Sequence, residues 1–245
     1  MVKLLKRIDL SIIVPAFNEE DGIGQTIRSI FEDAKRKGVK NLIKSFEVIV
    51  VDDGSFDETP KILGSLKGRY KNLKIITHKS NQGLGASIIK GVKHATKKFV
   101  TYLPSDGQVF LREITGGLKI APYADLVLTY RRRRKDYNHY RQILSRTLMI
   151  SMRIFFGLNF KDYNWVHIYK RDLFKHIKTK SHGVFYLGEV VVRTHKVGFK
   201  ILEAAAEYHP RSTGYSKNAR LQVVFATLRD LIKLWVELQM KPLLS

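Results

Sequence analysis

Phe99-Val100-Thr101-Tyr102-Leu103-Pro104-Ser105-Asp106-Gly107-Gln108 is the stretch of the chain that decides its fold. Its first half is apolar and aromatic, which is typical of a buried strand, and the strand stops at a polar turn. Ligands of open α/β sheets bind beyond the carboxyl ends of the strands. Asp106 and Gln108 are two residues apart, so in an extended segment their side chains point to the same side. Their carboxylate and amide oxygens suit Mg²⁺ or Mn²⁺. Taken alone, this stretch favours an ordinary Asp-Gly turn, and the rest of the chain shifts the balance to a metal site.

Three more strand-like runs precede this stretch, at residues 10–15, 46–51 and 73–77, and each leads into a helical segment. Asn18 or Asp21 is the expected cap of the first helix, and Asp57 or Thr59 that of the second. The alternation predicts an α/β fold with a Rossmann-like, doubly wound and mostly parallel sheet. Right-handed crossovers then place the carboxyl end of every strand on one rim, together with residues 15–19, 52–53 and 106–108.

The composition points to a polyanionic partner. The 245 residues include 44 Lys and Arg against 22 Asp and Glu, a net charge of +22. This excess of positive charge indicates that the partner is nucleic acid, anionic lipid or a phosphorylated substrate. The absence of cysteine excludes disulfides and thiolate metal sites. Residues 1–10 lack the apolar segment of a signal peptide, and no apolar run is long enough to predict a membrane-spanning helix.

Two common nucleotide-binding motifs are absent. Asp52-Asp53-Gly54-Ser55 follows a strand and is either a turn or a site where a carboxylate binds a ribose. Gly83-Leu84-Gly85 does not continue into a Gly-x-Gly-x-x-Gly fingerprint, because residue 88 is isoleucine. No Gly-Lys-Ser/Thr sequence is present. The sequence therefore favours neither a dinucleotide-binding Rossmann site nor a P-loop.

The second half of the chain is more basic. A predicted strand at 124–130 runs into four consecutive arginines from Arg131, and further strands are expected at 165–169 and 198–202, with a helix at 183–197. Helices at 140–158 and 219–239 combine apolar and cationic residues; Arg229, Lys233 and Glu237 are expected on one polar face of the last helix. Such helices suit a membrane interface, and packing against the rest of the domain is the alternative.

Five motifs, in order over residues 8–220, resemble glycosyltransferase family 2: residues 13–19, 50–59, 81–86, 104–108 and 211–217. The last is similar to the Arg-x-x-Gly-x-Ser-Lys signature of the dolichol-phosphate mannose synthase branch. The resemblance implies a GT-A fold. It also implies inverting, metal-dependent transfer of mannose or glucose from a nucleotide diphosphate sugar to a polyprenyl phosphate, dolichyl or undecaprenyl.

The same resemblance implies roles for individual residues. The nucleotide sugar is expected to contact Pro15, Phe17, Glu19, Val50, Asp52, Ser105, Asp106, Gln108, Arg211 and Lys217. Asp106 and Gln108 are the expected ligands of Mg²⁺ or Mn²⁺. Arg131, Arg141 and Ser145 are expected to hold the acceptor phosphate and, with Asp106, to be the catalytic residues. Pro104 stands where the family has the first aspartate of its metal motif, which predicts weaker metal affinity or a changed metal dependence.

The expected organisation is a GT-A domain over residues 1–218, with a nucleotide-sugar half at 1–110 and an acceptor half at 111–218. An amphipathic helix at 219–245 follows. GDP-mannose or UDP-glucose is the expected donor, and the protein is expected in the cytoplasm, peripherally bound to the anionic face of the cytoplasmic membrane. One alternative is a family 2 transferase for a soluble or polysaccharide acceptor. The other is a binding protein that lost catalysis at Pro104 and holds nucleic acid by charge, but no nucleic-acid-binding module stands out, so no such partner is expected.

Overall fold

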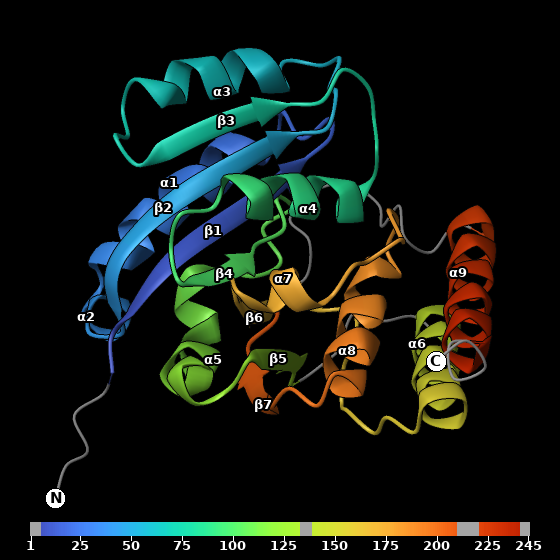
Figure 1. Ribbon diagram of the computed structural model, residues 1–245. Helices are drawn as coiled ribbons and strands as arrows, with labels where there is room; N and C mark the ends of the chain where they lie inside the picture. The colour runs from blue at the N-terminus through green and yellow to red at the C-terminus, as the bar shows by residue number, and fades with distance from the viewer. Residues whose placement is uncertain (1–5, 133–138, 210–220, 241–245) are drawn as a thin grey trace, which may run out of the picture.

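A seven-stranded sheet forms the centre of the protein (Figure 1). The computed structural model describes residues 6–132, 139–209 and 221–240. The strand order is β3-β2-β1-β4-β6-β5-β7. The strands are β1 (Ile8–Ala16), β2 (Ile43–Asp52), β3 (Leu73–Thr77), β4 (Phe99–Tyr102), β5 (Leu126–Arg131), β6 (His167–Lys170) and β7 (Ile201–Ala206). All pairings are parallel except those of β6, which is antiparallel to both β4 and β5. The predicted mostly parallel α/β sheet is confirmed.

Helices cover both faces of the sheet (Figure 1). They are α1 (Ile23–Lys35), α2 (Lys37–Lys40), α3 (Thr59–Lys67), α4 (Leu84–His94), α5 (Thr115–Ile120), α6 (His139–Phe156), α7 (Leu173–His176), α8 (Tyr186–Lys196) and α9 (Leu221–Met240), with 3-10 turns η1 (Leu111–Ile114) and η2 (Ala121–Tyr123). Two buried clusters result, one on each face of the sheet, and neighbouring residues of one strand point into different clusters. Leu10 and Ile12 belong to one cluster and Ile13 to the other. A strand buried on both faces needs a continuous apolar run, which is the pattern that predicted these strands.

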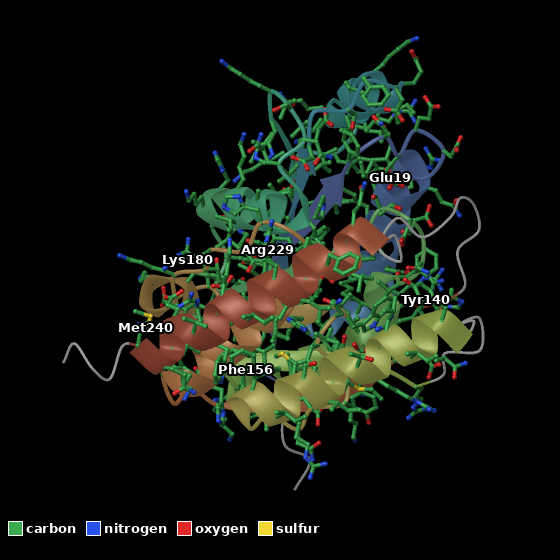
Figure 2. The ribbon with its side chains drawn as sticks, turned by 90° about the vertical axis from the view of Figure 1, so that its right-hand side faces the viewer. Glu19, Tyr140, Phe156, Lys180, Arg229 and Met240 are labelled. Atoms are coloured by element: carbon green, nitrogen blue, oxygen red, sulfur yellow. The ribbon has the colours of Figure 1, made fainter. Side chains whose placement is uncertain are left out.

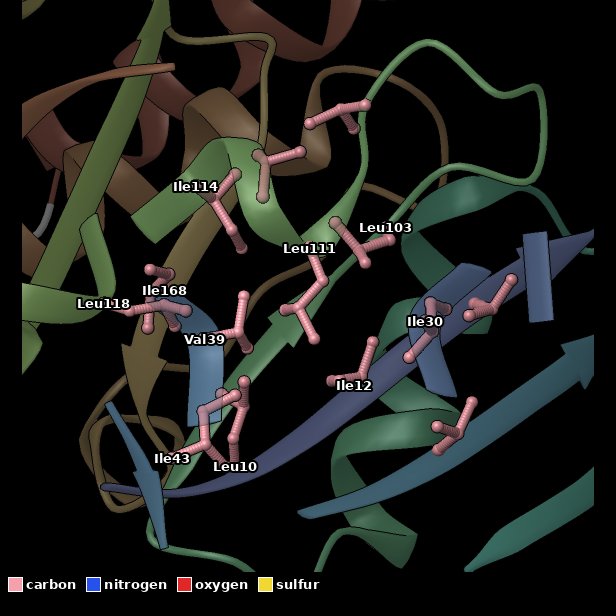
Figure 3. Packing of buried hydrophobic residues seen from close by; sticks show 14 of the residues in the cluster. Leu10, Ile12, Ile30, Val39, Ile43, Leu103, Leu111, Ile114, Leu118 and Ile168 are labelled. Atoms are coloured by element: carbon pink, nitrogen blue, oxygen red, sulfur yellow. The ribbon is translucent and has the colours of Figure 1, made fainter. Parts of the chain in front are cut away.

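The first cluster is drawn in Figure 3. There Leu10 and Ile12 of β1 face Ile30 of α1 and Leu111 of η1, and all four side chains are almost fully buried. Burying such side chains contributes roughly 1.5–3 kcal/mol each relative to exposure. This packing holds α1 and the chain after β4 against one face of the sheet, and so positions the turn that carries Asp106.

The predicted cap of the first helix is wrong. α1 begins at Ile23 without a side-chain cap, and the backbone oxygen of Glu19 accepts the amides of Gly22 and Ile23 instead. Asn18 is not available as a cap because its side chain accepts a hydrogen bond from the Phe56 amide, in a loop far along the chain. For α3 the prediction was nearly right. That helix begins at Thr59 after Glu58, and Asp57 Oδ1 accepts the Thr59 amide at 3.0 Å.

The late strands also differ from the prediction. β6 starts two residues later than expected, and β7 starts three residues later and continues to Ala206. β6 runs against its neighbours, so not every strand ends at the same rim. Because β6 begins at the rim where the others end, the preceding loop, residues 162–166, is brought there too. The two long amphipathic helices, by contrast, are found within two residues of their predicted ends. They are α6 and α9.

A buried carboxylate ties the early strands together. Glu47 of β2 accepts hydrogen bonds from Ser11 Oγ of β1 at 2.7 Å and from both the amide and the hydroxyl of Thr96 at 2.6 and 2.8 Å. Lys74 Nζ of β3 lies 2.7 Å from its other oxygen. Burial by itself raises the pKa of Glu47, but the bonds from Lys74, Ser11 and Thr96 outweigh it and lower that pKa from 4.5 to about 2.

We expect Glu47 to make the protein's stability depend on acid. The folded pKa lies below the unfolded value, so the contribution of Glu47, about 3 kcal/mol at most, is complete above pH 4.5 and disappears as the pH falls towards 2. Urea unfolding between pH 7 and pH 3 should show Glu47→Gln less stable at pH 7 and less sensitive to acid than the wild type. Glu58→Gln, at an exposed position, serves as control. An unchanged pH dependence in Glu47→Gln would contradict the assignment.

Candidate active site

The carboxyl ends of β2, β1 and β4 bring the predicted donor residues together. Ala16 at the end of β1 is paired with Asp52 at the end of β2, and β4 lies on the other side of β1. Thr26 Oγ1 of α1 donates to the backbone oxygen of Ser105 at 3.0 Å, which fixes the turn after β4 against the same end of the sheet. The predicted residues at this end of the sheet are Pro15, Phe17, Glu19, Asp52, Ser105, Asp106 and Gln108. Val50, also predicted, lies two residues before the end of β2, and its side chain is fully buried in the first cluster.

The loops after β1 and β2 are hydrogen bonded into one unit. The Asn18 amide donates to Ser55 Oγ at 3.0 Å, and the Phe56 amide donates to Asn18 Oδ1 at 3.1 Å. The Glu19 amide donates to Thr59 Oγ1 at 2.9 Å. Asp52 is fully buried, and its Oδ1 accepts the Ser55 amide at 3.0 Å. These contacts place Phe17 and Asp52 in fixed positions before any ligand arrives.

Asp53 has a positional role that sequence reasoning missed. One of its oxygens lies 2.6 Å from His78 Nδ1 and accepts the Gln82 amide at 2.9 Å, while the other accepts the Gly83 amide at 2.8 Å. Gly83 has φ +92°, in the left-handed region that favours glycine. The second aspartate of the Asp-Asp pair therefore holds the third motif, residues 81–86, in place. Its position directly after Asp52 is the only signal that marked it.

The turn after β4 carries the predicted metal ligands. Asp106 Oδ1 accepts the Gln108 amide at 3.1 Å, and Gln108 Nε2 donates to the Tyr208 hydroxyl at 3.0 Å. With that nitrogen committed to Tyr208, the side-chain oxygen of Gln108 is the atom suited to a cation. Within residues 6–132, 139–209 and 221–240, no group of three or more His, Asp or Glu is arranged to hold a metal. One carboxylate and one amide oxygen nevertheless fit Mg²⁺ or Mn²⁺ bound jointly with a diphosphate and water.

Arg131, at the end of β5, is held in a buried ion pair. Its Nε donates to Asp162 Oδ2 at 2.8 Å and its Nη2 to Asp162 Oδ1 at 3.0 Å, with the two side chains 7% and 3% exposed. The guanidinium lies 4.6 Å from the centroid of the Trp165 ring. Trp165 in turn meets Tyr208 edge to face, with centroids 5.4 Å apart. Gln108 and Arg131 are therefore linked through touching rings, Tyr208 and Trp165, although the chain separates them by more than twenty residues.

Sequence reasoning missed Asp162, Trp165 and Tyr208 as site residues. Asp162 lies in a loop without periodicity, and Trp165 was taken as part of a strand. Nothing local marks either one, because their partners come from β5 and from the segment after β7. Ser145 lies half-buried in α6. Arg211, Lys217 and the side chain of Arg141 lie outside the part of the chain that the structure describes.

Comparison with known proteins identifies the family. Residues 11–177 match the family model described as "Glycosyl transferase family 2". The chain belongs to glycosyl transferase family 2. Its fold is GT-A: the crystal structure of glucosyl-3-phosphoglycerate synthase from Mycobacterium tuberculosis, solved with Mn²⁺, uridine diphosphate and glucosyl-3-phosphoglycerate, superposes with a TM-score of 0.71. That superposition covers 93% of this chain and 80% of the other, at 17% identity, and shows the fold alone.

Two curated relatives of this family 2 chain have named activities. The dolichyl-phosphate beta-glucosyltransferase of Dictyostelium discoideum is 31% identical over 105 residues, which are 42% of this chain and 32% of that protein. The undecaprenyl-phosphate 4-deoxy-4-formamido-L-arabinose transferase of Pectobacterium carotovorum is 25% identical over 222 residues, 88% of this chain and 64% of that protein. The matched region thus spans about a third of the length of the first relative and less than two thirds of the second.

Two helices of this family 2 protein, α6 and α9, lie side by side at one side of the molecule (Figures 1 and 2). Each packs inward through buried residues, such as Met152 of α6 and Leu231 of α9, and Phe155 contacts Trp235 with ring centroids 5.5 Å apart. Each also leaves large apolar side chains exposed. They are Ile143, Ile150 and Ile154 of α6 and Phe225, Ile232, Val236 and Met240 of α9, which we call the α6–α9 apolar surface. The buried residues support packing of these helices against the domain, and the exposed apolar residues support a membrane interface.

Glu237 does not belong to an outward polar face, as the sequence suggested. Arg193 Nη2 of α8 lies 3.0 Å and Lys180 Nζ 3.1 Å from one of its carboxylate oxygens. Burial raises the pKa of the Glu237 carboxyl, and the bonds from Arg193 and Lys180 overcome this and lower it. Glu237 thus anchors α9 to the domain. No helix among the described residues has the length and hydropathy needed to cross a bilayer.

Proposed function

We propose that this chain transfers a hexose from a nucleotide diphosphate sugar to a polyprenyl phosphate, with inversion at the anomeric carbon. One observation carries the proposal: Gln108 on the donor side bonds the Tyr208 hydroxyl, Arg131 on the acceptor side packs over Trp165, and these two rings touch. The two reactants would thus meet at one place on the rim. The named activities of the two curated relatives, both transferases acting on a polyprenyl phosphate, support the same acceptor class.

The donor is proposed to lie along the ends of β1, β2 and β4. Its nucleoside would contact Pro15, Phe17, Glu19, Val50 and Asp52, and its diphosphate Ser105, Asp106, Gln108, Arg211 and Lys217. A divalent metal held by Asp106 and Gln108 would stabilise the negative charge of the leaving diphosphate. GDP-mannose and UDP-glucose are the proposed donors.

The acceptor phosphate is proposed to bind Arg131, Arg141 and Ser145. A phosphate monoester has its second pKa near 6 and is largely ionised at neutral pH, so its oxygen needs no strong base before it attacks. The work of the protein is then to align that oxygen with the anomeric carbon, opposite the leaving diphosphate. Asp162 orients the guanidinium of Arg131 for this task through two hydrogen bonds. In-line displacement of this kind inverts the configuration.

A prenyl chain stays in the bilayer, so the protein must approach the membrane. We propose that residues 1–218 form the catalytic domain and that the α6–α9 apolar surface docks on the anionic cytoplasmic face of the membrane as a peripheral contact. The net charge of +22 favours such a surface. Apolar side chains entering the interface would supply the remaining affinity.

Flotation with liposomes tests the docking. We expect the protein to float with vesicles that contain phosphatidylglycerol and to bind less at high salt, since the attraction is partly electrostatic. Ile154→Asp should weaken binding because Ile154 is 72% exposed on the α6–α9 apolar surface. Tyr123→Asp, at an exposed position on η2, is the matched control. Equal flotation of Ile154→Asp and the wild type would refute this docking surface.

The function itself is tested by transfer of radiolabel. The protein is incubated with labelled GDP-mannose or UDP-glucose, dolichyl or undecaprenyl phosphate, and Mg²⁺ or Mn²⁺, and the products are partitioned between water and organic solvent. We expect label from one donor to enter the organic phase only when a polyprenyl phosphate is present. Transfer to a soluble acceptor alone would overturn the lipid acceptor, and no transfer from any donor would overturn the enzymatic proposal.

A further inference from the structure

Phe56 is the most exposed large hydrophobic residue in the described part of the chain, at 84%. It does not belong to the α6–α9 apolar surface. It lies in the loop that follows β2, four residues after the buried Asp52, at the rim proposed to receive the nucleoside. An aromatic ring left in water at a functional rim, away from the other exposed apolar residues, points to a ligand that covers it.

The loop holds Phe56 in place through its backbone. The Phe56 amide donates to Asn18 Oδ1 at 3.1 Å, and the preceding residue, Ser55, accepts the Asn18 amide at 3.0 Å. Asn18 has φ +51°, a conformation that few residues other than glycine adopt. This reciprocal pair of bonds keeps Asn18 in the left-handed conformation. The chain therefore presents Phe56 from a fixed backbone rather than from a loose loop.

The ring of Phe56 meets the ring of Phe17. Their centroids are 5.9 Å apart and their planes are inclined by 78°, so the two rings form a corner. A flat ligand can stack on one ring while its edge contacts the other. Asp52, the last residue of β2, accepts the Ser55 amide through Oδ1 and so belongs to the same hydrogen-bonded unit. A flat apolar face beside hydrogen-bonding groups is what a nucleobase requires.

We propose that Phe56 is a nucleobase-binding residue, and that the base of the donor nucleotide stacks in the corner formed by Phe56 and Phe17. The proposal rests on the proposed function, which places the nucleoside at this rim, and adds a residue to it. Stacking on an aromatic ring tolerates any base, because every base has a π face. Phe56 therefore supplies affinity for the base, while recognition of its edge is left to polar groups such as Asp52.

Calorimetric titration of the full chain with GDP, UDP and inorganic pyrophosphate, each with Mn²⁺, tests this role. Removing one stacked base contact costs roughly fivefold to a hundredfold in affinity. We expect Phe56→Ala to weaken binding of GDP or UDP by about tenfold or more, and to leave pyrophosphate, which has no base, unchanged. Phe56→Trp should bind within about threefold of the wild type, and Phe56→Leu should bind as poorly as Phe56→Ala. Lys61→Ala, an exposed residue of the following helix, is the control.

The outcomes separate this proposal from the one on which it rests. If the wild type and Phe56→Ala bind the nucleotides equally well, Phe56 is not a base contact, and the proposed function stands. Recovery of affinity by Phe56→Leu as fully as by Phe56→Trp would also reject stacking. Weakened binding of pyrophosphate in Phe56→Ala would indicate a distorted loop and overturn the assignment. If the wild type binds neither nucleotide, the donor site of the proposed function fails, and this inference fails with it.

Discussion

Asp106→Asn is expected to lower the rate of hexose transfer by about a thousandfold, an effect of the size seen when a group that stabilises transition-state charge is removed. Asp106 contributes the single carboxylate of residues 104–108, because Pro104 occupies the place of the other metal-motif aspartate. The neutral amide removes the negative charge that would hold the cation. Asp106 Oδ1 accepts the Gln108 amide at 3.1 Å, and asparagine retains an oxygen that accepts this bond. The fold should therefore persist.

The measurement is the initial rate of label transfer as a function of Mn²⁺ concentration, with thermal unfolding to show that the variant is folded. Asp172→Asn, at an exposed position between β6 and α7, is the matched control. A second variant, Pro104→Asp, restores the missing carboxylate and should lower the Mn²⁺ concentration needed for half the maximal rate. Full activity of Asp106→Asn at saturating Mn²⁺ would remove Asp106 from the metal site.

Asp162→Ala is expected to destabilise the protein by about 3–5 kcal/mol, because it leaves the buried guanidinium of Arg131 without its carboxylate. Both side chains are less than a tenth exposed, and two hydrogen bonds join them. Arg131→Ala should cost a similar amount, since it leaves Asp162 buried and charged. The double variant should be less destabilised than the sum of the two, because neither charge is then left alone.

Urea unfolding of the four proteins measures this coupling. The Lys170–Asp125 pair in the same sheet is the control: its side chains are 33% and 22% exposed, and its loss should cost about 1 kcal/mol or less. If Asp162→Ala cost no more than that control, the pair would contribute little to the fold. Arg131→Lys keeps the charge but loses the planar fork, so it should raise the KM for the polyprenyl phosphate more than the KM for the donor. An unchanged acceptor KM would exclude Arg131 from the acceptor site.

The first half of the fold was predictable because its signals are local. Stretches such as residues 48–51 are continuous apolar runs, and those runs appear as such in the sequence because both faces of the sheet are buried. Asp52 ends β2 and Asp106 lies in the short turn after β4, so parallel pairing suffices to bring both to one rim. The helix caps were less predictable. Asn18 has the right chemistry for a cap, but its partner, Phe56, lies 38 residues away.

The acceptor side depended on contacts that no window of sequence contains. Asp162 and Arg131 are 31 residues apart, and Gln108 and Tyr208 are 100 apart. These contacts require β6 to be antiparallel to both of its neighbours, so that its amino end lies at the rim. Glu237 became an anchor for α9 because Arg193 of another helix approaches it. Periodicity along α9 contains no information about that approach.

Local patterning was enough to establish the order of strands and helices in the first hundred residues, the rim that collects the acidic turns, and the family motifs, since each depends on neighbours in the chain. The partner of Arg131, the orientation of β6 and the exposed part of α6 and α9 emerged only from the packed molecule. These features are set by which distant surfaces meet, and that depends on the free energy of the whole chain rather than on any segment.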